Sequence, residues 1–469
     1  MTRLGEHGPV VVVGGGLAGS MLSVYLARQG HDVQLYESRP DLRRSDVDSG
    51  RSINLALATR GLVPLRELGL AEAVEAITVP MAGRIIHPGD GSGDVSFQPY
   101  GNRPDEVIHS VSRQDLTALL LDAADATGRV EVHFEQWCHR VDTDRRVLHF
   151  SPFGDPDRIT EVPFGTVFGC DGSGSEIRED VSRAIGGTVS AEPLDHGYKE
   201  LTLPPRAGGG FQLDPGGLHI WPRGDLMLIA LANPEGDFTV TLFMPTGAPG
   251  TPSAEAAESF ESIRTVADVE GFFDRNFPDV PPLIDDLAEQ FLTHPTGSLA
   301  TVRVDGWALD DRAVLVGDAA HAIVPFHGQG MNLAMESCRL LDGHLREHPD
   351  DIARAFAAFE ADRKPDADAI ADMAIDNYME MRSDVIDPGY VQRRELALEL
   401  ERRNPERFVP RYGMVMFTTM PYAAVQDRAR RQQELLVSLT EASGPADTPI
   451  DMATAESMID ELGPLPDWK

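Results

Sequence analysis

The first clear hydrophobic pattern is an unbroken apolar run from Val10 to Val13, followed by glycines and an apolar stretch of helical length that ends near Leu26. A short, wholly apolar run predicts a strand buried on both faces. A second apolar stretch, "DVQLYE", ends at Glu37. Strand, glycine turn, helix and a second strand with a terminal acid are typical of a Rossmann-like α/β fold that binds a dinucleotide.

Each glycine of Gly14-x-Gly16-x-x-Gly19 has a physical role in such a site. The first permits the tight turn, the second lets a pyrophosphate approach the backbone, and the third lets the helix pack closely on the sheet. The helix N-terminus offers free N–H groups to phosphate, and an acid at the end of the second strand can accept hydrogen bonds from ribose hydroxyls. A glycine-rich turn without a ligand is the alternative interpretation. The candidate residues here are Gly14, Gly16, Leu17, Ala18, Gly19 and Glu37.

Two later glycine-rich segments indicate which dinucleotide is bound. The first is "FGCDGSGSEIR", which contains Asp171. In the second, an apolar strand ends at Gly317-Asp318, and a Gly-Gln-Gly turn then precedes a helix that starts near Met331. Asp318 can bind a ribityl hydroxyl, while the turn and the helix N-terminus point N–H groups at phosphate or at the flavin pyrimidine edge. An Asp after a strand can also be only a helix cap. Three such segments in this order predict non-covalent FAD, with further candidate contacts at Gly328, Gln329, Gly330, Met331 and Asn332.

These three segments resemble the flavin motifs of the single-component, class A flavoprotein hydroxylases. Within that group, shorter stretches from about residue 10 to about residue 420 are similar to the kynurenine 3-monooxygenase family. They are "RSINLAL" (51–57), "GRIIH" (83–87), "QPYG" (98–101), "VIHSVSRQDL" (107–116), "DHGYKEL" (195–201), "LHIWPRG" (218–224), "TLFMP" (241–245) and "DNYMEMR" (376–382).

The resemblance implies a Rossmann-like FAD-binding domain, an inserted antiparallel β-sheet substrate domain and a C-terminal helical region. It implies hydroxylation of L-kynurenine to 3-hydroxykynurenine with NADPH and O2, through a flavin C4a-hydroperoxide. Because the flavin carries this chemistry, no catalytic side chain is expected. By resemblance, Arg113 lies beside the flavin phosphates and the segment of Asp171 is associated with transient NADPH binding. No second Rossmann fingerprint is visible, and the residues do not distinguish NADPH from NADH.

The substrate of such an enzyme carries an α-amino acid carboxylate and an aryl ketone. Arg84 is the best candidate for a carboxylate clamp, because a guanidinium grips both oxygens, and Tyr100 can donate to the same group. A surface salt bridge is the alternative for Arg84. His327 as a general base is disfavoured, because an aniline-type ring needs little deprotonation. By resemblance, the polar end is completed by Asn377 and Tyr412, and the ring is packed by Phe243, Phe326, His327 and Met381, for which core packing is the alternative.

The hydrophobic pattern also divides the chain. Residues 1–75, 107–182 and 296–350 are predicted to form a discontinuous FAD-binding domain, with a capped helix starting at Ser112. Short apolar or alternating runs separated by turn residues make 76–106 and 183–295 a β-rich substrate domain. Residues 351–469 read as a helical region completing the substrate pocket, with Pro365 as a predicted kink.

Composition narrows the functional class. A formal net charge of -34 argues against nucleic acid and anionic membranes as partners. No signal peptide and no apolar run of about 20 residues is visible, so a cytoplasmic protein without the C-terminal anchor of eukaryotic relatives is expected. Cys138, Cys170 and Cys338 are predicted to be buried free thiols, and no metal-ligand spacing appears. The oligomeric state is left open, with a homodimer as the one candidate.

Three other functions stay open. A related class A hydroxylase acting on a kynurenine or anthranilate derivative in secondary metabolism is the nearest. A flavin-dependent halogenase would need a tryptophan-rich motif and a catalytic lysine, whereas "HIWPRG" is not that motif and lysine is scarce. A non-catalytic flavin-binding sensor would need a signalling domain, and none is visible.

Overall fold

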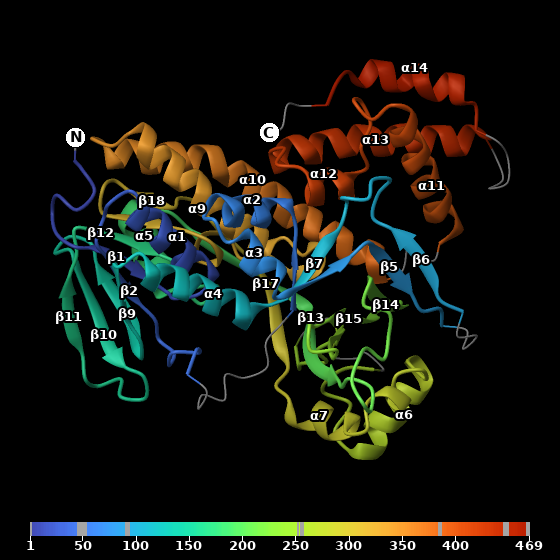
Figure 1. Ribbon diagram of the computed structural model, residues 1–469, viewed down its shortest axis with the longest axis horizontal. Coiled ribbons are helices and arrows are strands. Elements are labelled where there is room, and N and C mark those ends of the chain that lie inside the picture. Colours follow the sequence, from blue (N-terminus) through green and yellow to red (C-terminus); the bar gives the residue numbers. More distant parts are fainter. Residues whose placement is uncertain are drawn as a thin grey trace. The chain divides into compact units, whose positions relative to one another are not determined.

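The structure is a computed structural model that describes residues 2–44, 54–89, 94–250, 253, 258–382, 387–443 and 450–465 (Figure 1). The chain forms two compact units. Unit 1 consists of Met1–Ile77, Val111–Pro193 and Ala300–Ala371, and unit 2 consists of Thr78–Ser110, Leu194–Leu299 and Asp372–Lys469. The first three residues of the "RSINLAL" stretch, 51–53, lie outside the described residues.

Unit 1 is built on a six-stranded sheet with the strand order β18-β19-β12-β1-β2-β8. The strands from β19 to β8 run parallel, and only β18 is antiparallel to its neighbour. Residues Val10–Val13 of the central strand β1 are at most 3% exposed, as an apolar run in a parallel sheet requires. The strand bounds are β1 Val10–Val13, β2 Val33–Tyr36, β8 Val130–His133, β12 Thr166–Gly169, β18 Ala308–Leu309 and β19 Ala313–Leu315.

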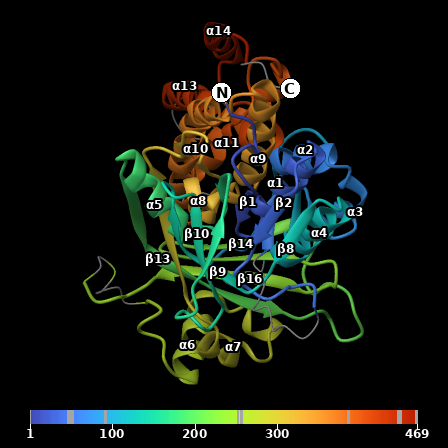
Figure 2. The same cartoon turned by 90° about the vertical axis from the view of Figure 1, so that its left-hand side faces the viewer.

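Helices of unit 1 pack on this sheet and on one another. Helix α1 lies beside β1 and β2 and also packs against α4 and α9 (Figure 2). Ser112 caps α4 as predicted, because its Oγ accepts a hydrogen bond from the amide of Asp115. A smaller antiparallel sheet contains β9 Gln136–Asp142, β10 Val147–Pro152 and β11 Thr160–Pro163. The helices and 3-10 helix are α1 Leu17–Arg28, α2 Thr59–Glu67, α3 Ala71–Glu75, α4 Arg113–Ala126, α5 Glu176–Ile185, α8 Asp318–His321, η3 Pro325–His327 and α9 Gly330–Glu347.

Unit 2 contains a seven-stranded sheet with the order β17-β13-β16-β15-β14-β5-β6. The strand pairs β13–β16, β16–β15, β15–β14 and β5–β6 are antiparallel, whereas β14 and β5 run parallel. Two of its strands, β13 and β17, begin or end in unit 1. The bounds are β5 Gly83–Ile86, β6 Ser96–Pro99, β13 Val189–Leu203, β14 Gly217–Arg223, β15 Leu226–Ala232, β16 Phe238–Pro245 and β17 Gly297–Val304. Shorter strands elsewhere are β3 Asn54–Leu57, β4 Thr78–Met81 and β7 Ile108–Ser112.

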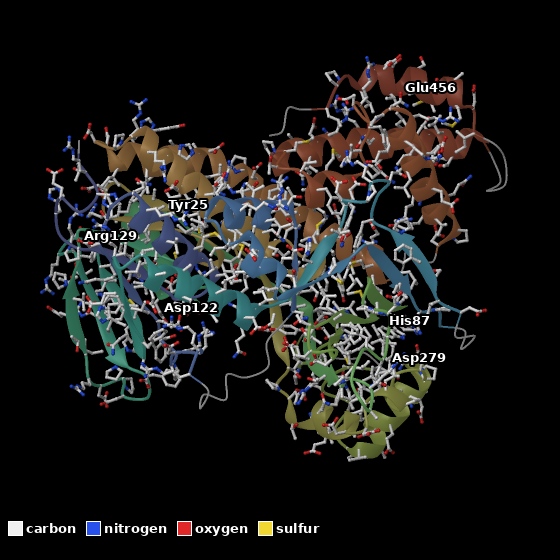
Figure 3. All side chains as sticks on the ribbon, in the orientation of Figure 1. Tyr25, His87, Asp122, Arg129, Asp279 and Glu456 are labelled. Carbon is white, nitrogen blue, oxygen red and sulfur yellow. The ribbon has the colours of Figure 1, made fainter. Side chains whose placement is uncertain are left out.

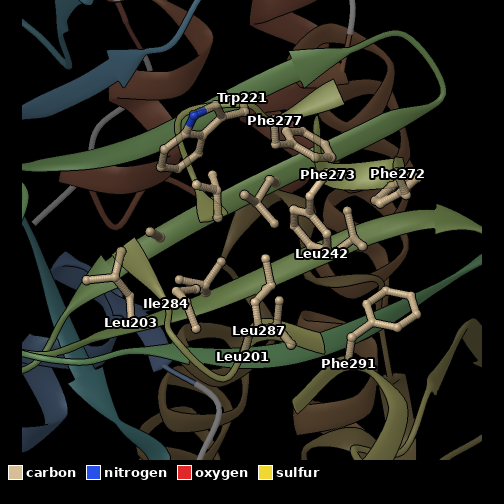
Figure 4. Close-up of a cluster of buried hydrophobic side chains, with 14 of the residues drawn as sticks. Leu201, Leu203, Trp221, Leu242, Phe272, Phe273, Phe277, Ile284, Leu287 and Phe291 are labelled. Atoms are coloured by element: carbon tan, nitrogen blue, oxygen red, sulfur yellow. The ribbon is translucent and has the colours of Figure 1, made fainter. Parts of the chain in front are cut away.

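One face of this sheet is covered by helices that the sequence analysis missed. Helices α6 (Val266–Asn276) and α7 (Leu287–Thr293), with the 3-10 helix η2 (Pro281–Leu283), interrupt the segment predicted to be β-rich. Their aromatic side chains pack against the strands in a buried hydrophobic cluster around Trp221 and Leu242 (Figure 4). The signal was present, because Thr265 and Asp268 form a capping box ahead of apolar residues at helical spacing.

The C-terminal region is helical, as predicted. Helix α10 (Ile352–Arg382) continues through Pro365 and contains residues of both units. The helices α11 (Pro388–Arg403), α12 (Arg411–Phe417), α13 (Tyr422–Ser443) and α14 (Met452–Leu462) follow in unit 2. A second apolar cluster holds α11, α13 and α14 together.

Unit 1 also buries a network of four charged side chains. Glu336 on α9 accepts hydrogen bonds from Arg60 at 3.0 Å and from Arg363 at 2.6 Å. Arg363 also pairs with Asp366 at 3.2 Å. All four are at most 7% exposed. Two cations and two anions therefore balance in the interior, which fixes α2 and α10 to the helix α9.

The described residues include no helix long and apolar enough to cross a membrane. Cys138, Cys170 and Cys338 are buried free thiols, which confirms their predicted state.

Candidate functional site

The glycine turn after β1 has the close approaches that the sequence predicted. Gly14 has φ +104°, and a Cβ there would lie 2.2 Å from the carbonyl oxygen of Cys170. A Cβ at Gly19 would lie 1.9 Å from the carbonyl oxygen of Gly14. In contrast, a Cβ at Gly16 would meet nothing within 4 Å. The first two positions need glycine for the fold, whereas Gly16 leaves space beside the start of α1.

The start of α1, with Leu17 and Ala18, is suited to an anion. Gly16 is its N-cap, so no side chain caps the helix and its first turn contains no acid. Glu37, 6% exposed, accepts hydrogen bonds from the amide of Gly15 and from Arg39, both at 2.8 Å. Burial raises the pKa of Glu37, but the hydrogen bonds and charge of Arg39 lower it further, so the net pKa is below the usual value. The acid is thus an ionised acceptor at the end of β2, as ribose binding requires.

The third glycine-rich segment forms a second turn in unit 1. Gly317 and Gly328 have φ +68° and +63°, which favours glycine at both positions. Asp318 starts α8 and is half-buried, and burial raises its pKa while Arg113, exposed at the start of α4, opposes the rise. Helix α9 begins at Gly330 without a side-chain cap, so the amides near Met331 are oriented for a ligand.

Asn332 and Asp171 have structural roles besides any ligand contact. The amide of Asn332 donates to the carbonyls of Ala56 and Gly328, both at 2.8 Å, and accepts from Ala58 at 2.9 Å. Gln329 precedes it and is fully buried. Asp171 accepts hydrogen bonds from Ser175 and from the first turn of α5, so its carboxylate acts as a helix cap. For both residues a cofactor contact stays a prediction.

A separate cavity lies entirely within unit 2. Its volume is about 830 Å³, and its walls come from β5, the residue after β6, the end of α10, and α11 to α13. Four predicted substrate residues line it together, although they are far apart in sequence. They are Arg84, Tyr100, Asn377 and Tyr412.

Arg84 is the central cation of this cavity. It is 4% exposed, its guanidinium lies 4.7 Å from the centroid of the Tyr412 ring, and Tyr100 stacks on Tyr412 at 5.1 Å. The Nε of Arg84 and the hydroxyl of Tyr100 are buried without a hydrogen-bond partner among the described residues. Burial lowers the pKa of Arg84, but Tyr390, Tyr412 and Glu380 outweigh this, and the guanidinium stays charged. The surface salt bridge considered for Arg84 is wrong, because this side chain is buried.

The remaining predicted residues lie elsewhere. Met381 is 4% exposed, and its sulfur lies 3.1 Å from the amide nitrogen of Asn377 on the same helix. Phe243 is a buried residue of β16 in unit 2 and does not line the cavity. Phe326 and His327 are buried residues of η3 in unit 1. Their contact with a substrate ring stays a prediction.

Comparisons with known proteins identify the family of this chain. A family model described as "FAD binding domain" matches residues 7–196 and 295–374, more than half of the chain. A kynurenine 3-monooxygenase of Stenotrophomonas maltophilia (strain K279a) is 47% identical over 448 residues, covering 96% of this chain and 95% of that protein. One of Myxococcus xanthus (strain DK1622) is 44% identical over 452 residues, covering 96% and 94%.

The chain belongs to the kynurenine 3-monooxygenase family. This confirms the resemblance and the fold class inferred from the sequence. Solved structures agree on the fold. The 2-methyl-3-hydroxypyridine-5-carboxylic acid oxygenase has a TM-score of 0.63 at 21% identity, covering 83% of this chain and 95% of that one. Pseudomonas aeruginosa PqsL in complex with 2-aminobenzoylacetate has a TM-score of 0.62 at 19% identity, covering 80% and 96%.

Glu380 is the main residue of the unit 2 cavity that the sequence analysis missed. Its carboxylate accepts hydrogen bonds from Tyr390 at 2.6 Å and Arg411 at 2.8 Å, and pairs with Arg84 at 3.5 Å. A sequence signal existed, because Glu380 is three residues after Asn377 and so shares its helix face. Tyr390 and Arg411 lie outside the short matching stretches, which is why they were not identified.

Another missed carboxylate, Glu401 on α11, gives a pH-dependent stability. It is 5% exposed and accepts a 2.7 Å hydrogen bond from Asn102, two residues after Tyr100. Burial, followed by the nearby Glu106 carboxylate, raises the pKa of Glu401 from 4.5 to about 7. The folded state therefore binds more protons than the unfolded state between these values, and stability falls as pH rises through that window.

We expect Glu401→Gln to be more stable than the wild type at pH 8, by about 1–2 kcal/mol after allowance for solvent screening. The two proteins should converge below pH 4.5, where Glu401 is protonated in both states. Urea unfolding midpoints at pH 8 and at the lowest pH where the protein stays folded measure this. Glu395→Gln removes an exposed carboxylate of the same helix and should show no such gain. Equal midpoints for Glu401→Gln and wild type at pH 8 would contradict the prediction.

Proposed function

We propose that this chain hydroxylates L-kynurenine at the 3-position, using FAD, NADPH and O2. The observation that carries the substrate assignment is the charge balance of the unit 2 cavity. The cavity is lined by five arginines and four acids, which leaves one positive charge in excess in a chain whose net charge is -34. They are Arg84, Arg393, Arg394, Arg411 and Arg430, and Asp376, Glu380, Asp427 and Glu434. This local positive excess favours a ligand with a carboxylate.

The cavity also supplies specific donors for that carboxylate. Arg84 Nε and the Tyr100 hydroxyl are buried donors without a protein partner among the described residues, and Asn377 lines the same wall. A carboxylate bound here would meet charge-assisted hydrogen bonds in a largely desolvated site, where they are strongest. The aromatic faces of Tyr100 and Tyr412 fit an aryl substrate that carries such a group.

The FAD site is assigned to unit 1. The open space at Gly16, the uncapped starts of α1 and α9, and the ionised Glu37 fit a dinucleotide with its pyrophosphate at α1. When bound, FAD supplies the activation of O2 for aromatic hydroxylation. The protein's own residues hold the cofactor and orient the substrate.

We also propose that unit 1 is the cofactor domain, and that unit 2 supplies substrate recognition from its sheet and its C-terminal helices. The named relatives support kynurenine as substrate at 44–47% identity over nearly full length. Three buried free thiols suit a reducing cytoplasm, where NADPH is regenerated.

The decisive test is product analysis of purified protein with L-kynurenine, NADPH and ¹⁸O₂. One labelled oxygen atom in 3-hydroxykynurenine, with NADPH consumed in equal amount, is expected. Anthranilate and ring-substituted kynurenines serve as competing substrates, and a preferred one of these would assign the chain to a related hydroxylase. Flavin that is reduced by NADPH without any hydroxylated product would support the sensor instead.

A further inference from the structure

A buried pair of histidines lies in unit 2 on the strands β5 and β14. His87 directly follows β5 and is 7% exposed, and His219 on β14 is 2% exposed. The Nε2 of His87 lies 2.8 Å from the Nδ1 of His219. The Nδ1 of His87 lies 3.1 Å from a carboxylate oxygen of Asp279, and both of these residues are labelled in Figure 3. The Nε2 of His219 lies 2.8 Å from the carbonyl oxygen of Asp214.

The groups at the two ends of this chain of hydrogen bonds determine how many protons the two imidazole rings carry. Asp279 presents a carboxylate and Asp214 a backbone carbonyl, and both are acceptors. The outer nitrogen of each ring must therefore carry a hydrogen, and the bond between the two rings needs a third. Two neutral imidazoles carry only two N–H groups between them. The pair must hold one positive charge.

The surroundings place that charge on His87. Burial, opposed in part by the Asp214 carbonyl, lowers the pKa of His219 to about 4, so its ring is neutral. His87 faces the Asp279 carboxylate and stacks on the Trp221 ring at 3.8 Å, and an aromatic face favours a cation. Trp221 also donates a 2.7 Å hydrogen bond to the same carboxylate. Burial raises the pKa of Asp279, but the hydrogen bonds from His87 and Trp221 lower it further, so Asp279 is ionised.

His87 lies on the face of β5 opposite to the face that carries Arg84. Strand β5 has only four residues and lies one strand from the sheet edge. Side chains alternate along it, so Arg84 and His87 are on opposite faces. Arg84 pairs in register with Leu218, next to His219 on β14. Arg223 adds hydrogen bonds to the carbonyls of His87 at 2.9 Å and Pro88 at 3.0 Å.

We propose that His87 is a buried imidazolium, held by Asp279 and His219, that positions β5 and thereby Arg84 for the substrate carboxylate. His87 touches no reacting atom and is a positioning residue. The link to substrate rests on the proposed function, whereas the protonation state of His87 does not. The charged and titratable groups that face His87 are Asp279 and His219. The guanidinium of Arg223 is also near, because it donates to the backbone carbonyls of His87 and Pro88.

Protonation is tested on the wild-type holoenzyme labelled with ¹⁵N-histidine. Long-range ¹H–¹⁵N spectra at pH 7.5 are expected to show one ring with both nitrogens protonated, and this signal should vanish in His87→Gln. Asp279→Asn removes the negative charge and offers an amide N–H that can donate to the Nδ1 of His87, so the pair no longer needs a third proton and the doubly protonated signal should be lost there as well. A wild-type His87 ring with one bare nitrogen at pH 7.5 would overturn the proposal, whether or not the protein hydroxylates kynurenine.

Positioning is tested by steady-state kinetics on Asp279→Asn. KM for L-kynurenine is expected to rise roughly tenfold, while kcat changes less than about twofold and FAD content stays that of the wild type. Asp274→Asn removes an exposed carboxylate of helix α6 and serves as the matched control, with unchanged KM. An unchanged KM in Asp279→Asn would overturn the positioning role. A wild type that does not hydroxylate kynurenine would instead refute the proposed function and leave the NMR result as the test of His87.

Discussion

Arg84→Ala is expected to raise KM for L-kynurenine by roughly 30-fold to several-thousand-fold. Removing one partner of a desolvated, hydrogen-bonded charge pair costs on the order of 2–5 kcal/mol, and each 1.4 kcal/mol is about tenfold in affinity. The loss should appear mainly in KM, because the clamp holds the ground state and the transition state alike. Initial rates over a wide range of L-kynurenine concentrations measure it.

We expect this variant to fold. Glu380 keeps its hydrogen bonds from Tyr390 and Arg411 when Arg84 is removed, so its carboxylate stays paired. Arg84→Lys should restore only part of the affinity, because it keeps the charge without the bidentate fork. Arg430→Ala is the matched control, since Arg430 lines the same cavity but its side chain is 68% exposed and pairs with Asp427. A near-normal KM for Arg84→Ala would remove this residue from the substrate site.

Gly16→Ala is expected to weaken FAD binding on the order of 100-fold without destabilising the apoprotein. The φ of -75° and ψ of -168° at Gly16 suit alanine, and the added methyl group meets nothing within 4 Å. The methyl group would instead occupy the space through which the pyrophosphate approaches the backbone. Fluorescence titration of apoprotein with FAD measures the affinity, and thermal unfolding of the apoprotein measures stability.

Two further glycine variants give this test its controls. Gly19→Ala places a Cβ 1.9 Å from the carbonyl oxygen of Gly14, so it should lower the stability of the apoprotein itself. Gly343→Ala lies within α9 with nothing within 4 Å, so it should keep FAD affinity and gain slightly in stability. Normal FAD affinity in Gly16→Ala would place the pyrophosphate elsewhere.

The flavin segments were predictable because they depend on local geometry. A positive φ, as at Gly14, and a close backbone contact, as at Gly19, each require glycine, and a glycine at a fixed spacing is visible in the sequence. The C-terminal contributors to the cavity were harder to identify. Glu380 looks in the sequence like a solvated helix charge, and only the fold brings it beside Tyr390 and Arg411.

Tertiary context also explains the other omissions. The capping box at Thr265 is a local signal that was outweighed by the surrounding strand-like runs, so α6 was missed. The contact between His87 and His219 joins residues 132 positions apart, and neither shows its partner in the sequence. Side-chain networks of this kind follow from the pairing of strands, which sequence patterns do not specify.

The buried network of Arg60, Glu336, Arg363 and Asp366 has an evolutionary consequence. Loss of one member leaves an uncompensated charge in the interior, at a cost of about 3–5 kcal/mol, whereas joint replacement by well-packed apolar residues can be neutral. Any path of single substitutions from one arrangement to the other therefore passes through a poorly folded intermediate. Among descendants of this chain, these four positions should be inherited together or exchanged together, which makes them a marker of shared ancestry.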